Sequence, residues 1–151
     1  MTFEAICPEN RERINRFIEE HWFTTTMVVR GREIDMTRVD GGEIVGLATF
    51  LFYDGLCEIV SLDSLRENQG IGTALLTRVL AQARQRGCAK AVLITTNDNL
   101  RAMGFYQKRG FDMVALYRNA LDVSRRLKPE IPAIGENGIP LRHEIEFEKE
   151  L

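Results

Sequence analysis

Residues 66–76 read RENQGIGTALL, in which Gly70 and Gly72 stand one residue apart. An apolar run precedes this stretch and an amphipathic pattern follows it, so the glycines are predicted to join a strand to a helix. The first N–H groups of a helix lack partners within the helix and lie at the positive end of its dipole. A turn of this kind is suited to bind phosphate.

Two common phosphate-binding motifs do not fit this turn. A dinucleotide fingerprint requires a third glycine three residues after Gly72, where the chain has Leu75. A P-loop requires Gly-Lys-Ser/Thr after a four-residue gap, and the chain contains no such run. The alternative interpretation is a tight turn that binds nothing. The rest of the sequence is needed to distinguish it from a phosphate site.

The composition predicts one globular domain spanning residues 1–151. Hydrophobic residues make up 44% of the chain and charged residues 28%, and the net charge of −2 argues against unspecific binding of nucleic acid. The apolar stretches are no longer than strands, so no segment is expected to cross a membrane. The N-terminus lacks the pattern of a signal peptide, which predicts a cytoplasmic location.

The cysteines and histidines do not predict a metal site. Cys7, Cys57 and Cys88 lie far apart in the sequence, and so do His21 and His143. No Cys-x-x-Cys pair is present, so we expect reduced thiols and no metal.

The apolar periodicity predicts strands alternating with helices. Before the glycines it indicates a first strand over residues 3–7 and a helix from residue 8 to about 21. A hairpin turn at 40–42 leads into a strand over 44–53, and a second hairpin turn at 54–55 leads into a strand over 56–65. After them it indicates a helix that ends at Gly87, a strand over 91–96 covered on both faces, and a helix over 100–109 capped by residues 97–99.

The C-terminal part is predicted to contain an alternating strand over residues 111–117 and a short helix over 120–127. A surface loop over residues 128–140, which contains three of the four prolines, is followed by a half-exposed last strand with Leu141, Ile145 and Phe147 on one face. The whole order predicts a mixed α/β (α+β) fold.

Four blocks in this order resemble the GCN5-related N-acetyltransferase (GNAT) superfamily. They are EIVSL at residues 58–62, QGIGTALL at 69–76, NDN at 97–99 and FYQKRGF at 105–111. The resemblance covers most of the chain and implies a mostly antiparallel, twisted sheet with splayed central strands and helices on both faces. It also implies acetyl-CoA as co-substrate, whose acetyl group passes directly to a primary amine through a tetrahedral intermediate.

The resemblance assigns the cofactor-binding residues. The pyrophosphate is expected on the backbone N–H groups of Gln69, Gly70, Ile71, Gly72 and Thr73, and the pantetheine arm on the strands ending near Leu62 and Thr95. Asn97, Asn99 and Tyr106 complete the expected cofactor-binding set. The chain departs from the family at Glu67, where Arg or Gln is usual.

Three residues are candidates for catalysis. The N–H of Leu62 is expected to polarise the thioester carbonyl, and Tyr106 to protonate the departing thiolate, unless Tyr106 is only a packed aromatic. Phe105 beside it is expected in the core. Glu58 is the first candidate for the base that deprotonates the amine, unless it is an exposed strand residue or part of an ion pair.

Asp63 is the second candidate base, and strand alternation predicts that it lies on the opposite face from Glu58. An amine that arrives deprotonated would need no base. His143 is expected to have a structural role. Trp22 is expected either to border the acceptor cleft or to lie in the core.

The acceptor is expected to be a small-molecule or peptide amine, and the sequence does not specify which one. Tyr117, Arg118 and the loop over residues 128–140 are candidates to cover it. A homodimer is compatible with the family, and neither nucleic acid nor a membrane is expected as a partner. The alternative function is that of a non-catalytic module that binds acyl-CoA as a sensor or partner.

Overall fold

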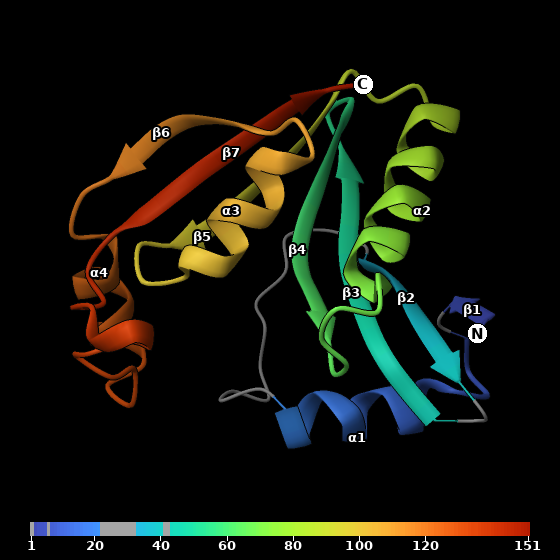
Figure 1. Ribbon diagram of the computed structural model, residues 1–151, viewed down its shortest axis with the longest axis horizontal. Coiled ribbons are helices and arrows are strands. Elements are labelled where there is room, and N and C mark those ends of the chain that lie inside the picture. The colour runs from blue at the N-terminus through green and yellow to red at the C-terminus, as the bar shows by residue number, and fades with distance from the viewer. Residues whose placement is uncertain (1, 6, 22–32, 41–42) are drawn as a thin grey trace. The chain divides into compact units, whose positions relative to one another are not determined.

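The computed structural model describes residues 2–5, 7–21, 33–40 and 43–151, with the backbone alone for residues 18–21 and 33–40 (Figure 1). Trp22 and the turn residues Gly41 and Gly42 lie outside the described residues. The chain divides into two compact units, one of residues Met1–Ala89 with Leu151 and one of residues Lys90–Glu150. A single domain over residues 1–151 stays a prediction.

The first unit contains a four-stranded antiparallel sheet in the order β1-β2-β3-β4. Its elements are β1 (Thr2–Ala5), α1 (Arg11–His21), β2 (Glu33–Asp40), β3 (Glu43–Tyr53), β4 (Leu56–Ser64) and α2 (Ile71–Gln85). Asp54 and Gly55 have φ angles of 48° and 72°, as a two-residue hairpin turn of type I′ requires. The predicted hairpin and the helix that ends at His21 are therefore confirmed.

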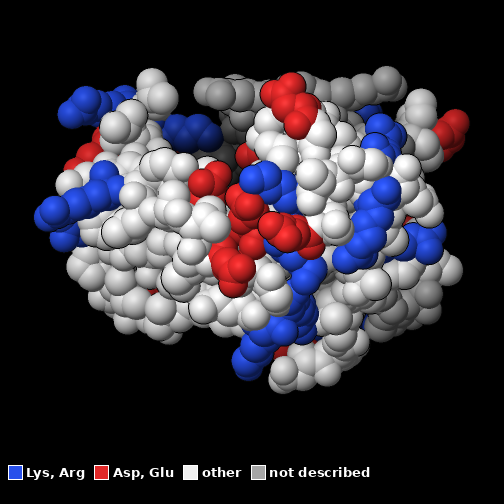
Figure 2. Space-filling model, turned by 90° about the horizontal axis from the view of Figure 1, so that it is seen from above, with Lys and Arg blue, Asp and Glu red and all other residues white. Residues whose placement is uncertain are grey.

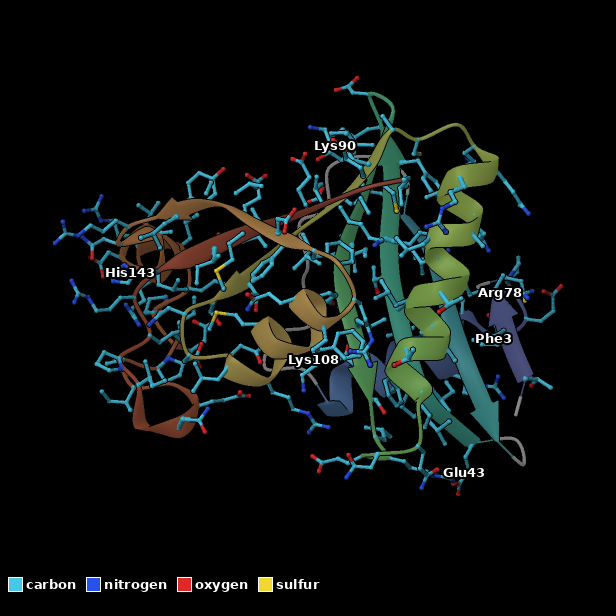
Figure 3. The ribbon with its side chains drawn as sticks, turned by 45° about the horizontal axis from the view of Figure 1, so that its top comes forward. Phe3, Glu43, Arg78, Lys90, Lys108 and His143 are labelled. Carbon is cyan, nitrogen blue, oxygen red and sulfur yellow. The ribbon has the colours of Figure 1, made fainter. Side chains whose placement is uncertain are left out.

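The two helices of this unit cover opposite faces of the sheet. A Cβ atom on Gly46 in β3 would lie 2.6 Å from Cγ2 of Ile71, so α2 lies directly on that face. The next residue, Leu47, points the other way and packs with Ile14 and Phe17 of α1. Arg78 of α2 also lies over the ring of Phe3 in β1, 5.3 Å from its centroid (Figure 3).

The second unit contains a three-stranded antiparallel sheet in the order β5-β7-β6. Its elements are β5 (Lys90–Thr96), α3 (Leu100–Lys108), β6 (Asp112–Tyr117), α4 (Ala120–Leu127), a 3-10 turn over Glu136–Gly138 and β7 (Glu144–Glu150). Both units therefore combine helices with antiparallel sheet, which confirms the predicted mixed α/β fold class.

Three predictions for this unit need correction. Ala91 and Leu93 of β5 are buried, but Ile94 is 44% exposed, so this strand is not covered on both faces. The burial of β6 does not alternate, because β7 is its one partner among the described strands and most of its residues are exposed. The last strand begins at Glu144 rather than Leu141.

The late start of β7 has a specific cause in the side chain of Asn97. Its Oδ1 accepts hydrogen bonds from the N–H groups of Arg142 and His143, both at 2.9 Å, and its Nδ2 donates to the carbonyl of Pro140 at 2.9 Å. The backbone before Glu144 is therefore held by a side chain.

The loop over residues 128–140 is ordered by a second side chain, Asp98, which is 5% exposed. Its carboxylate accepts hydrogen bonds from Thr96 Oγ1 and, at 2.8 Å, from the N–H of Glu136. Gly135 lies so close to this carboxylate that a Cβ atom would overlap it. No helix in the described ranges is both long enough and apolar enough to span a bilayer.

We expect Gly135→Ala to destabilise the protein by about 1–3 kcal/mol, because the added methyl group overlaps a buried carboxylate that its own hydrogen bonds hold in place. Gly104→Ala is the matched control. Gly104 lies inside α3 and a Cβ atom there meets nothing within 4 Å, so this substitution should stabilise the helix by up to about 1 kcal/mol. Thermal unfolding of the two variants measures both effects, and equal melting temperatures would contradict the close contact with Asp98.

Candidate cofactor-binding and acetyl-transfer site

The N-terminus of α2 is open to an anion. Gly70 is the N-cap residue and has a left-handed backbone (φ 70°, ψ 14°), with no side-chain cap, and a Cβ atom at this position would meet nothing within 4 Å. The first bond within the helix runs from the N–H of Ala74 to the carbonyl of Gly70, at 2.9 Å. The N–H groups of Ile71 and Gly72 have no acceptor within the helix, and its first turn contains no acidic residue.

The loop before the helix combines two left-handed residues with a basic side chain. Asn68 has a φ angle of 58°, so it and Gly70 curve the chain into the helix. Arg66 forms an ion pair with Glu43 at 3.6 Å, and a long pair of this kind at the surface contributes little to stability. Glu67, which replaces the usual Arg or Gln, is exposed.

The two candidate bases in β4 lie on the same face of the sheet. Glu58 is opposite Leu51 in β3, and Asp63 is opposite Leu47. Leu47 and Leu51 are four residues apart on an unbroken strand, so they share a face. The prediction that Glu58 and Asp63 point to opposite faces is therefore wrong, because a β-bulge at Val60 shifts the alternation by one residue.

Two buried hydroxyl groups lie between these carboxylates. Thr49 and Ser61 are opposite each other in the ladder, and the oxygens of both side chains are buried without a hydrogen-bond partner among the described residues. Thr49 is only 2% exposed. An unpartnered buried hydroxyl is costly, and such groups are normally paired with water or a ligand.

This polar strip consists of Glu58, Ser61 and Asp63 in β4 with Thr49 in β3, and it lies on the face that α1 covers. Leu62 alternates with its neighbours and lies opposite Ala48, on the face of α2. Its assigned role in catalysis stays a prediction.

Cys57 precedes the polar strip and is chemically inert. Its side chain is fully buried, and this burial raises the pKa of the thiol to about 12, with Cys88 and Glu58 adding smaller electrostatic contributions. The thiol therefore stays protonated at neutral pH, whereas a nucleophilic cysteine requires its thiolate form.

In the second unit, Tyr106 is held by aromatic rings on three sides. Its ring centroid lies 5.1 Å from Phe105, 5.4 Å from Phe111 and 6.3 Å from Phe147, and the residue is 7% exposed. Edge-to-face pairs of this kind stabilise the orientation of a ring. Tyr106 is thus a packed aromatic in a fixed orientation, and a catalytic role for its hydroxyl stays a prediction.

Phe105 is not in the core, contrary to expectation. It is half-buried, and the guanidinium of Arg109 lies over its ring at 3.7 Å and donates a hydrogen bond to its carbonyl at 2.9 Å. Since Phe105 and Tyr106 are neighbours on a helix, they point in different directions, and the structure buries the tyrosine.

Both asparagines of the expected cofactor-binding set have structural contacts. Asn99 caps α3, as predicted, and its side chain accepts a hydrogen bond from the N–H of Ala102 at 3.1 Å. Asn97 holds the chain before β7. Contacts of either residue with the cofactor stay predictions.

His143, labelled in Figure 3, directly precedes β7, and its contacts agree with the structural role expected for it. Its Nδ1 accepts a hydrogen bond from the N–H of Asn119 at 2.8 Å, which leaves the proton of a neutral imidazole on Nε2.

Charges of both signs are interspersed on the face seen in Figure 2, in keeping with the small net charge. Two groups in the second unit have raised pKa values. Burial raises the pKa of Glu144, and the hydrogen bond from the Tyr117 hydroxyl to Glu146 raises the pKa of that hydroxyl. Among the described residues, no group of three or more His, Cys, Asp or Glu side chains is arranged to hold a metal ion.

Sequence reasoning missed Thr49, Ser61 and Asp98. Ser61 lies in the EIVSL block but received no role, Thr49 lies in none of the blocks, and the two hydroxyls meet only because of the strand register. Asp98 was expected to help cap a helix and instead holds a loop nearly forty positions further along the chain. The NDN block predicted the helix cap at Asn99 but not the contact of Asp98 with the loop.

The profile of the Acetyltransferase (GNAT) family matches residues 3–111. Two proteins of Bacillus subtilis, the uncharacterized proteins YxbD and YdhI, are 41% and 44% identical to the chain. The first match covers 100% of this chain and 99% of YxbD, and the second covers 95% of this chain and 96% of YdhI. A crystal structure of a Bacillus subtilis acetyltransferase in complex with CoA is similar with a TM-score of 0.75 and 21% identity, covering 99% of this chain and 97% of that one.

The chain therefore belongs to the GNAT family of acetyltransferases. The open N-terminus of α2 lies within the matched residues, and so does Tyr106. The activity that the family defines is acetyl transfer from acetyl-CoA.

Proposed function

We propose that this protein transfers the acetyl group of acetyl-CoA directly to a primary amine. The observation that carries the proposal is the turn at Gly70, where a helix begins with open N–H groups, no side-chain cap and no acidic residue. The helix dipole and these donors together favour a pyrophosphate. The cofactor would accept hydrogen bonds from the backbone of residues 69–73.

The remaining cofactor contacts follow the resemblance to the family. The pantetheine arm would pair with backbone near Leu62 and Thr95, in the manner of an added strand. Asn97 and Asn99 would contact the cofactor with their backbone atoms, since their side-chain oxygens already hold neighbouring chain. Arg66 supplies the positive charge that Glu67 does not.

The chemistry proceeds in two steps on the thioester. The amine nitrogen attacks the carbonyl carbon, and the N–H of Leu62 donates a hydrogen bond to the oxygen on which negative charge develops. The intermediate then collapses, the carbon–sulfur bond breaks, and Tyr106 donates its proton to the departing thiolate. The acetyl group remains on the amine as an amide.

The polar strip supplies the proton acceptor. A primary alkylamine has a pKa near 10.4 and is protonated at neutral pH, so a base raises the fraction that can attack. Glu58 stays the first candidate. Asp63 is an equally suitable candidate by position, because it lies on the same face of the sheet as Glu58. Water held by the hydroxyls of Thr49 and Ser61 would connect the amine to either carboxylate.

Cys57 does not suit a route through an acetylated enzyme. The thiol of Cys57, beside Glu58, is kept protonated by its burial. A non-catalytic acyl-CoA sensor is the second candidate function. The feature that favours it is Glu67, which precedes the turn at Gly70 and stands where the family usually has Arg or Gln. The acceptor would be a small-molecule or peptide amine. The protein itself would be cytoplasmic, as a monomer or as a homodimer.

Acetyl-CoA is expected to raise the melting temperature of the protein, and Gly70→Ala to abolish most of that rise. Gly87→Ala is the matched control, because Gly87 at the other end of α2 has a similar φ angle of 75° and equally open surroundings. Both substitutions should lower the free energy of unfolding by about 1–2 kcal/mol, because alanine is strained in a left-handed backbone. Only the first alters the turn that is proposed to bind the pyrophosphate, which we call the phosphate cradle. An equal loss of binding in both variants would contradict the cradle.

Tyr106→Phe should lower kcat by about 10²- to 10⁴-fold with little change in acetyl-CoA affinity, because it removes a proton donor and keeps the ring. The rate is measured as CoA release over a panel of amines, and affinity by calorimetry. Tyr53→Phe serves as the control tyrosine and should leave kcat unchanged, since Tyr53 is the last residue of β3, beside the hairpin turn at Asp54. An undiminished rate in Tyr106→Phe would remove this residue as the acid.

Glu58→Gln and Asp63→Asn separate the two candidate bases. The variant that lacks the base should lose most of its rate near neutral pH and recover it as the pH approaches the pKa of the amine, since free amine then forms without help. The other variant should keep the wild-type pH profile. If neither profile changes, the amine arrives deprotonated and the polar strip has no role in catalysis.

A further inference from the structure

The polar strip places its charged and hydroxyl side chains at regular intervals along the β3–β4 hairpin (Figure 1). Glu58 and Asp63 stand at its two ends, and Thr49 and Ser61 meet halfway between them, because their ladder positions follow at every second residue of β3. A strand rises about 3.3 Å per residue, so each carboxylate position lies about 7 Å from the hydroxyls and about 13 Å from the other carboxylate position.

The two hydroxyls in the middle of the strip require donors that the described residues do not supply. Thr49 is only 2% exposed, and the oxygens of Thr49 and Ser61 are buried without a hydrogen-bond partner among these residues. A hydroxyl oxygen accepts hydrogen bonds through its lone pairs, and leaving it unpaired when buried is costly. The strip therefore presents a negative charge, two unpartnered acceptors and a second negative charge, in that order.

This spacing selects the kind of ligand that matches the strip. One metal ion cannot bind both carboxylates, because oxygen ligands lie within about 2.6 Å even of a calcium ion. A complementary ligand carries its positive charges apart, with a further donor between them. A linear polyamine has this form, since it has a primary ammonium group at each end and a secondary ammonium group within the chain.

We propose that the amine acceptor is a linear triamine of the spermidine type, bound along the polar strip. This inference rests on the proposed acetyl transfer. The terminal ammonium groups bind Glu58 and Asp63. The secondary ammonium group has two N–H donors, one for the hydroxyl of Thr49 and one for that of Ser61, directly or through a water molecule. The transfer converts one terminal ammonium group and the thioester into an amide, the free thiol of CoA and one proton.

The dimensions of spermidine agree with those of the strip. An extended chain advances roughly 1.2 Å per bond, so the terminal nitrogens of spermidine lie about 11 Å apart and its two arms span about 5 and 6 Å. An ammonium–carboxylate hydrogen bond of about 2.8 Å at each end covers the remaining separation. A monoamine or a single lysine side chain offers one positive charge, so it leaves one carboxylate and the hydroxyls unmatched.

Three amines of equal chain length test this recognition. In octamethylenediamine a methylene replaces the middle nitrogen of spermidine, and octylamine also lacks one terminal nitrogen. Calorimetry with the protein in the presence of CoA should give the lowest Kd for spermidine, a Kd about 10-fold higher for octamethylenediamine, and a further rise of about 10-fold for octylamine. Spermidine that does not bind, or octylamine or a single-lysine peptide that binds as tightly, would overturn the proposal.

Substitutions assign the recognition to the strip. Thr49→Val keeps the volume of the side chain and removes an unpartnered hydroxyl, so it should unfold no more easily than the wild type. It should raise the Kd of spermidine about 10-fold, to that of octamethylenediamine. Glu58→Gln and Asp63→Asn should each raise the Kd of spermidine by about 10-fold or more.

Asp54→Asn is the matched control for the two carboxylates. It removes an exposed carboxylate from the turn of the same hairpin, where a left-handed backbone suits asparagine, and it should leave the Kd of spermidine unchanged. An equal loss of binding in Asp54→Asn and in the two strip variants would contradict specific recognition, and so would a Thr49→Val variant that still prefers spermidine.

Binding and turnover together separate this inference from the proposed function. If the amines bind in the stated order and none causes release of CoA from acetyl-CoA, the proposed transfer is wrong and the recognition of polyamines is confirmed. If CoA is released with an equal kcat/KM for all three amines, the transfer is confirmed and the recognition of polyamines is overturned.

Discussion

The close approach of α2 to β3 at Gly46 determines the geometry of the first unit. A Cβ atom there would lie within 3.0 Å of Ile71, of Leu75 and of the carbonyl oxygen of Asp63. The first turn of the helix is thereby fixed on the sheet beside the end of β4. Since Ile71 follows directly after Gly70, the open N–H groups of the helix take their position from this contact, and any larger residue at position 46 would displace them.

The same sheet separates two kinds of chemistry by face. The face of α2 carries apolar side chains such as Ile59 and Phe50 and leads to the helix N-terminus. The other face carries the carboxylates and hydroxyls of the polar strip together with the apolar contact of Leu47 with α1. The proposed anion site and the two candidate bases therefore lie on opposite faces of the sheet. Leu62 lies between the two candidate bases in sequence, and its side chain faces the other way.

The order of elements and the boundaries of most helices could be predicted from the sequence, because apolar periodicity and glycine positions encode them locally. The cap at Asn99 and the left-handed turns at Gly55, Gly70 and Gly87 are examples. The bulge at Val60 could not be predicted, because it depends on the register between two strands, and one extra residue was enough to bring Asp63 to the face of Glu58.

Which residue of the Phe-Tyr pair of α3 is buried was also beyond local sequence, since both residues are aromatic and one of the rings that contact Tyr106, Phe147, comes from a distant strand. The loop after α4 was expected as surface chain, but the residues that hold it, Asn97 and Asp98, belong to a block that a local pattern assigns to a helix cap. Such long-range contacts carry no local signature.

The way this loop is held has a consequence for how the protein can change. Asn97 and Asp98 bond to backbone atoms of Pro140, Arg142, His143 and Glu136, and Arg125 donates to the carbonyls of Ile131 and Pro132. None of these bonds depends on the side chains of the loop residues that receive them. The exceptions are Gly135, Gly138 with its left-handed backbone, and Asn137, which is also left-handed and donates from its side chain to the carbonyl of Asp98. The other loop residues can exchange their side chains while the path of the loop is kept, so that a new surface chemistry can evolve on an unchanged backbone.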